Sequence, residues 1–166
     1  ILIADGFEDL QLFCPWFRLQ EEGVEVKIAA PNLRTVTGKH GYFVEPDTPL
    51  HELNPSEYDL LLIPGGSSPE KLRLTEEAVD IARTFVHEER IVAAIGHGPQ
   101  LLISAQTIDR RGVTLPPGIR HDFRAADSSY PVADVHTDVH LSTFDRHEAL
   151  SRFCFWVMHV AGMLGP

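Results

Sequence analysis

Three short apolar runs in this sequence each end in a glycine-containing turn and lead into a helical pattern. The runs are residues 1–4, 60–63 and 91–95, and the turns contain Gly6, then Gly65 and Gly66, then Gly96 and Gly98. Short apolar runs between turns are typical of buried strands, and their alternation with helical patterns indicates parallel strands joined by helices. The sequence therefore predicts an α/β fold.

The other elements are predicted from helix boundaries and turn residues. We expect helices over residues 9–22, 75–87 and 99–105, and a last helix that a capping box of Asp145 and Glu148 begins. Gly23 is placed to end the first helix and Thr75 to cap the second. A second strand is expected at residues 24–30 and a short hairpin at residues 37–44.

Size and composition restrict the classes of function. With 166 residues, of which 43% are hydrophobic and 23% charged, the chain is expected to form one domain over residues 1–166. A net charge of −10 without a basic cluster argues against nucleic acid as a partner, and no apolar run is long enough to span a membrane. Two cysteines without a disulfide framework predict a cytoplasmic protein.

The turns after the three parallel strands are the candidate site. Ligands of open α/β sheets bind outside the carboxyl ends of the strands, so these turns should converge. The third turn begins the string Ala-Ile-Gly-His-Gly-Pro-Gln-Leu-Leu-Ile-Ser-Ala, residues 94–105. It resembles the elbow of the PfpI branch of the ThiJ/PfpI superfamily, whose usual form is A-x-C-H-G-P-Q-x-L-I-S-A.

Further matches to this family follow in order along the first two-thirds of the chain. They are residues 4–9, 37–41, 58–59, 63–66, 69–70 and 72–74. Beyond Asp122 the resemblance thins, because residues 134–150 replace the family's usual hairpin and the segment after it. The resemblance implies a flavodoxin-like three-layer α/β/α sandwich with a mostly parallel central sheet.

The resemblance also assigns roles to individual residues. The family's nucleophile is a cysteine on the elbow, and Gly96 stands in its place here. Glu8 corresponds to the acid that contacts the nucleophile, His97 to the adjacent histidine, and Glu70 to the acid that orients a histidine across a subunit contact. Gly65, Gly66 and Gly98 correspond to substrate-binding turns. Covalent thiol chemistry is therefore expected to be lost or disabled, by natural loss or by substitution.

Three functions remain open on this basis. The resemblance implies an intracellular cysteine-dependent hydrolase of the peptidase, glyoxalase or deglycase type, and in this chain the covalent activity is expected to be lost or disabled. It could instead be a non-catalytic binding protein or chaperone-like oligomer, or it could retain acid/base chemistry by Glu8 and His97 on a bound water. A small-molecule or peptide ligand and a homo-oligomer, dimer or higher, are expected, with no cofactor and no metal.

Two other groups of residues have both a functional and a purely structural interpretation. Strand alternation over residues 134–140 would place two aspartates and two histidines on one face, as in a metal site, but an edge hairpin that turns at Thr137 and Asp138 is favoured. His121 and Asp122 fit either the pocket or the start of a helix. The aromatic side chains at helical spacing are interpreted as core or interface: Trp16, Phe17, Phe153 and Trp156.

Overall fold

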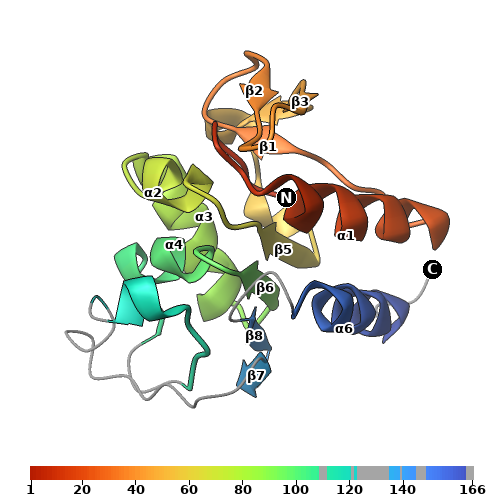
Figure 1. Ribbon diagram of the computed structural model, residues 1–166, viewed down its shortest axis with the longest axis vertical. Coiled ribbons are helices and arrows are strands. Elements are labelled where there is room, and N and C mark those ends of the chain that lie inside the picture. Colours follow the sequence, from red (N-terminus) through yellow and green to blue (C-terminus); the bar gives the residue numbers. More distant parts are fainter. Residues whose placement is uncertain (109–111, 121, 123–134, 139, 145–148, 164–166) are drawn as a thin grey trace.

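A computed structural model gives the structure of the chain, and it describes all residues except 109–111, 121, 123–134, 139, 145–148 and 164–166 (Figure 1). Its helices are α1 (Asp9–Glu21), α2 (Ser68–Leu72), α3 (Glu76–His87), α4 (Pro99–Ser104) and α6 (Leu150–Met163). Its strands are β1 (Ala29–Ala30), β2 (Val36–Thr37), β3 (Phe43–Val44), β4 (Thr48–Pro49), β5 (Leu60–Ile63), β6 (Ile91–Ile95), β7 (Val135–Asp138) and β8 (Leu141–Phe144). Short 3₁₀ turns lie at Leu50–Glu52, Pro55–Glu57 and Pro117–Ile119.

The central sheet has the strand order β5-β6-β8-β7. Strands β5, β6 and β8 are parallel, and β7 is antiparallel to β8. The first residues of the chain continue this arrangement beyond β5, because the Leu2 N–H donates to the Leu62 carbonyl at 3.1 Å and the Ile3 N–H to the Ala29 carbonyl at 2.9 Å. The predicted first strand therefore lies between β5 and β1, although only the Leu2–Ala29 pair forms a bridge.

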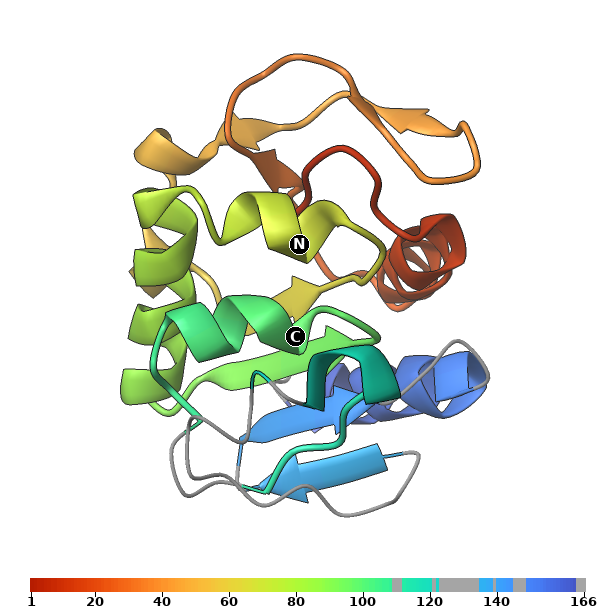
Figure 2. The same cartoon turned by 60° about the vertical axis from the view of Figure 1, so that its left-hand side comes forward.

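Helices cover both faces of the sheet, and the alternation of side chains along each strand decides what each helix contacts. Leu61 and Ala94 point toward α3 and α4, whereas Leu62 and Ala93 point toward α6. Figure 2 shows α2, α3 and α4 on one side of the sheet and α1 and α6 on the other. Burial on both faces explains why β5 and β6 are continuous apolar runs in the sequence.

Several sequence predictions need correction in detail. The strand expected at residues 24–30 is reduced to β1, Ala29–Ala30. Thr75 precedes α3, as expected, but its side chain makes no capping hydrogen bond. Thr137 and Asp138 belong to β7 and pair with β8, so the hairpin turns after them and not at them. The capping box of Asp145 and Glu148 and the residue His121 lie outside the described residues.

Other predictions agree with the structure. Helix α1 ends just before Gly23, which has a φ of +78°. The hairpin at residues 37–44 is present as β2 and β3. Phe153, interpreted as core or interface, is fully buried together with Val157 where α6 packs on the sheet. Among the described residues, no helix combines the length and apolar character required to cross a lipid bilayer.

Candidate functional site

The turns that follow residues 1–4, β5 and β6 lie against one another at the carboxyl ends of the strands. The Glu8 N–H donates to the Gly65 carbonyl at 3.2 Å, and the Ser67 N–H donates to the Gly6 carbonyl at 2.9 Å. Gly66 has a φ of +76°, and a Cβ on it would stand 2.1 Å from the Gly6 oxygen. Only glycine fits such a backbone approach, so these turns are held in one fixed arrangement.

The elbow, residues 96–98, has a left-handed first residue. Gly96 has a φ of +59°, is buried, and donates its N–H to the Phe144 carbonyl at 2.9 Å. The Gly98 N–H donates to the Ile95 carbonyl at 2.9 Å. The His97 N–H has no acceptor among the described residues. A left-handed conformation costs residues other than glycine about 1–3 kcal/mol. The backbone at position 96 would therefore strain most side chains, and it is occupied by glycine, which tolerates this conformation.

Gln11 is the residue whose side chain would lie nearest to a side chain at position 96. A Cβ on Gly96 would stand 3.3 Å from both Nε2 and Oε1 of Gln11. The Gln11 Oε1 accepts a hydrogen bond from the Gly65 N–H at 2.8 Å, and the side chain is only 3% exposed. Its carboxamide thus links the second turn to the elbow. The sequence interpretation missed Gln11, although its position three residues after Glu8, on the same side of α1, was an available signal.

Glu8 contacts residues of the β2–β3 hairpin. Its carboxylate lies 3.1 Å from His40 Nε2 and 3.3 Å from Lys39 Nζ, and the side chain is 11% exposed, against 57% for His40 and 59% for Lys39. Glu8 supplies none of the three atoms nearest to a Cβ at position 96. The matched stretch at residues 37–41 contains both partners, but the sequence interpretation gave neither of them a role. The structure thus places a buried carboxylate beneath two exposed basic groups.

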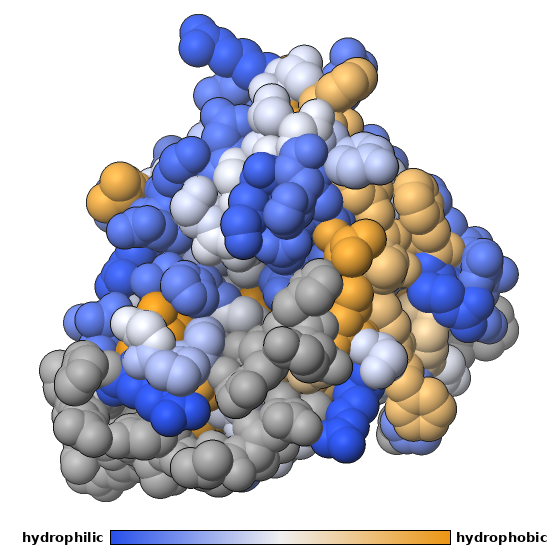
Figure 3. Space-filling model, viewed as in Figure 1, coloured by the Kyte–Doolittle hydropathy of each residue, from blue (hydrophilic) through white to orange (hydrophobic). Residues whose placement is uncertain are grey.

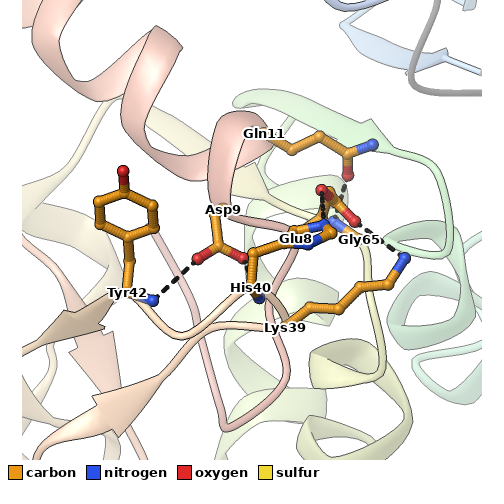
Figure 4. Close-up of polar contacts among 7 residues, drawn as sticks. All are labelled: Glu8, Asp9, Gln11, Lys39, His40, Tyr42 and Gly65. Carbon is orange, nitrogen blue, oxygen red and sulfur yellow. Dashed lines mark hydrogen bonds and ion pairs between the residues drawn. The ribbon is translucent and has the colours of Figure 1, made fainter.

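Asp9 fixes the hairpin that carries these basic groups (Figure 4). Its Oδ2 accepts from the His40 N–H at 2.9 Å and its Oδ1 from the Tyr42 N–H at 3.2 Å. The side chain is buried. Because both oxygens receive backbone hydrogens, Asp9 is a structural residue that holds His40 beside Glu8.

His97 and Glu70 are the sequence-predicted site residues with exposed side chains. His97 lies on the elbow and Glu70 on α2. Within the part of the chain that the structure describes, neither side chain has a hydrogen-bonding or ion-pair partner. Their positions leave both available to a ligand or to another subunit, and the structure pairs Glu8 with His40 rather than with His97.

Glu8, Asp9 and His40 could also be considered as cation ligands, since one ligand atom from each lies within 4.8 Å of the others. Their existing contacts argue against this. Both Asp9 oxygens accept backbone N–H groups, and a cation near Glu8 would compete with the Lys39 ammonium. We therefore describe the three as a hydrogen-bonded cluster.

The alternative metal hypothesis at residues 134–140 also loses support. His140 lies after the end of β7, outside the strand alternation on which the hypothesis depends. Its Nε2 lies 3.2 Å from the Val86 carbonyl. The His136 ring lies against Gly112. Asp134 is outside the described residues, and Asp122 lies 3.9 Å from Arg73. The described residues of this segment do not gather into a ligand set.

Comparisons with known proteins agree on the family and on the fold. A model of the DJ-1/PfpI family matches residues 1–159. Deglycase PfpI of Pyrococcus furiosus is 50% identical over 122 residues, 74% of each chain, and a deglycase of Pyrococcus abyssi is 47% identical over 138 residues, 83% of each chain.

A solved structure matches almost the whole chain. It is a two-domain protein from Anabaena variabilis with DJ-1/ThiJ/PfpI-like and ferritin-like domains, with a TM-score of 0.94 and 28% identity. The match covers 97% of this chain and 48% of that one, so this chain spans about half of its length. The fold is the flavodoxin-like α/β sandwich expected from the sequence.

Proposed function

We propose, since this chain belongs to the DJ-1/PfpI family, that it binds a small carbonyl compound or peptide at the elbow without forming a covalent bond to it. The observation that supports this is the elbow itself, where Gly96 offers no side chain and a Cβ in its place would stand 3.3 Å from the Gln11 carboxamide. Neither cysteine replaces the missing thiol, because Cys14 lies in α1 and Cys154 in α6.

Loss of covalent chemistry follows from the chemistry of the family. Two similar proteins are named deglycases, and the family resemblance implies an elbow cysteine as nucleophile for deglycase, glyoxalase or peptidase activity. A covalent intermediate requires a nucleophilic side chain, and glycine has none. The whole-chain resemblance therefore supports a ligand site of the family type, whereas Gly96 argues against its thiol step.

Groups that can hold a ligand remain at the site. The His97 N–H is without a described acceptor and can donate to a carbonyl oxygen. The Glu8 carboxylate, flanked by His40 and Lys39, can accept from a hydroxyl or amine. Such a set orients a carbonyl compound or a peptide unit by hydrogen bonds alone.

The test uses methylglyoxal as the probe. We expect no turnover that iodoacetamide abolishes, and we expect the His97 amide resonance to shift as methylglyoxal is added. The matched control is the double variant Cys14→Ser, Cys154→Ser, which should behave identically. Turnover that iodoacetamide removes would contradict the loss of thiol chemistry, and an unmoved His97 resonance would contradict binding at the elbow.

A second candidate function is acid/base catalysis on a bound water. It is favoured by the contact between Glu8 and His40, because a buried carboxylate beside an imidazole is suited to proton transfer. Turnover of this kind would survive iodoacetamide but fall in Glu8→Gln and His40→Gln. Unchanged turnover in both variants would exclude the pair as the catalytic groups.

We also propose that the chain forms a homo-oligomer. We propose in addition that it is located in the reducing environment of the cytoplasm. Apolar side chains gather on the face around α1 in Figure 3. Leu10 and Phe17 of α1 are 49% and 53% exposed, and Tyr42 of the β2–β3 hairpin is 65% exposed. Glu70 is exposed and available to a neighbouring copy. Sedimentation velocity at micromolar concentration should give a dimer or larger, and a monomer would remove the intersubunit role of Glu70.

A further inference from the structure

The two cysteines of the chain lie on helices that pack against each other. Cys14, Arg18 and Glu22 follow one another at intervals of one turn along a single side of α1. Arg18 and Glu22 line a groove together with Cys154 and Met158 of α6. The side of α1 that carries Cys14 therefore faces the side of α6 that carries Cys154 (Figure 1).

The environment of the thiols agrees with this placement. Both cysteines are half-buried and neither forms a disulfide. The pKa of the Cys154 thiol is raised to about 11, mainly by burial and also by the neighbouring Cys14, while Arg18 opposes the change. The effect of Cys14 on the pKa of Cys154 agrees with the position of the two side chains on facing sides of the packed helices.

We propose that Cys14 and Cys154 form a dithiol pair that small disulfides, such as oxidised glutathione, convert into a disulfide between α1 and α6. This redox site is separate from the elbow and does not depend on the proposed function. It requires that the two sulfur atoms can reach bonding distance through movements of the side chains and of the helices that bear them.

The reaction proceeds in two exchange steps. The Cys14 thiolate attacks one sulfur of the small disulfide, forming a mixed disulfide and releasing one thiolate, which takes up the proton that Cys14 lost. Cys154 then loses its proton and attacks the Cys14 sulfur, releasing the second small thiol. The two protein thiols are oxidised and the small disulfide is reduced to two thiols. We assign the first attack to Cys14, because the high pKa of Cys154 leaves little thiolate at neutral pH.

The experiment exposes the reduced full-length chain to oxidised glutathione and follows its intact mass. We expect a monomeric product that has lost two hydrogens and carries no glutathione, and peptide mapping should join Cys14 to Cys154. The closing step should accelerate about tenfold per pH unit between pH 7 and 9, because the Cys154 thiolate fraction rises in that proportion below its pKa. The apparent Tm should rise by roughly 5–15 °C on closure.

The variants Cys14→Ser and Cys154→Ser are the matched controls. Each should stop at a mixed disulfide on the remaining cysteine, with circular dichroism unchanged from that of the parent. The proposal would be overturned by a parent chain that keeps stable glutathione adducts on either cysteine. It would equally be overturned by a product whose disulfide joins two chains, which non-reducing electrophoresis reveals.

Discussion

A cysteine nucleophile of this family needs a thiol on a strained turn, and in this chain the two properties lie in different regions, the strand-end turns and the α1–α6 helix pair. The turns have the strained backbone, with Gly96 at a φ of +59°, but no thiol. The helix pair has two thiols, but in regular helical backbone where burial raises the pKa of Cys154. A thiol becomes a nucleophile through its surroundings, so the presence of cysteine in a chain says little about where its chemistry lies.

Helix α1 belongs to both regions and makes the difference visible within one element. Its first turns supply Asp9 and Gln11, whose side-chain oxygens accept hydrogen bonds from backbone N–H groups of the hairpin and of the second turn. Its later turns supply Cys14 and Arg18, which face α6. The same helix therefore holds the strand-end turns at one end and lines the groove beside α6 at the other.

The largest expected effect tests the rigidity of the turns. Gly66→Ala places a Cβ 2.1 Å from the Gly6 oxygen at a φ of +76° and should lower the free energy of unfolding by about 3–5 kcal/mol. Gly23→Ala, at the end of α1, is the matched control, since its φ is +78° but nothing lies within 4 Å. It should cost only about 1–2 kcal/mol. Equal losses in urea denaturation would mean that the turns are no more closely packed than the helix end.

The second prediction places a thiol in the strained turn. Gly96→Cys should be alkylated by iodoacetamide faster than Cys154 at pH 7, because the start of α4 favours a thiolate at position 96, whereas burial raises the pKa of the Cys154 thiol. The free energy of unfolding should fall by about 1–3 kcal/mol. Gly96→Ala should show the same loss of stability and no new alkylation site. A new thiol with an ordinary pKa and unchanged stability would show that the turn is not a preserved nucleophile elbow.

A third prediction separates two neighbouring carboxylates by their partners. Asp9→Asn should lower the free energy of unfolding by about 1–3 kcal/mol, because the amide cannot accept both backbone N–H groups from a buried position. Glu8→Gln should cost less than about 1 kcal/mol, since its partners are two exposed side chains. Thermal denaturation of the two variants measures this. A larger loss for Glu8→Gln would reverse their structural and functional assignments.

The smallest expected effect concerns alkaline stability of the helix pair. The pKa of Cys154 is raised from 9.0 to about 11, so between these values the unfolded chain loses a proton that the folded chain retains. The contribution of this thiol to stability is therefore complete below pH 9 and declines as pH rises toward 11. Cys154→Ser should show a shallower decline than the parent in urea denaturation across that window. Identical slopes would mean that the thiol is not buried against α1.

Local patterns predicted the elements that are regular and well buried. The apolar runs at residues 60–63 and 91–95 became β5 and β6, and Phe153, interpreted as core or interface from its helical spacing, is buried on α6. These succeeded because burial on both faces leaves an unbroken apolar signal in a strand and a periodic one in a helix. The strand at residues 24–30 was overestimated, because pairing with distant partners decides how much of an extended segment becomes a strand.

The sequence by itself determined the α/β class, the order of the strand-end turns and the absence of a side chain at position 96. Only the tertiary structure decided which groups meet there. It set Gln11 in front of the elbow, paired Glu8 with His40 and Lys39 from a hairpin about 30 residues away in sequence, and turned Cys14 toward Cys154. The reason is physical: backbone preference and hydrophobic period act within a few residues, whereas side-chain partners are chosen by how whole elements pack.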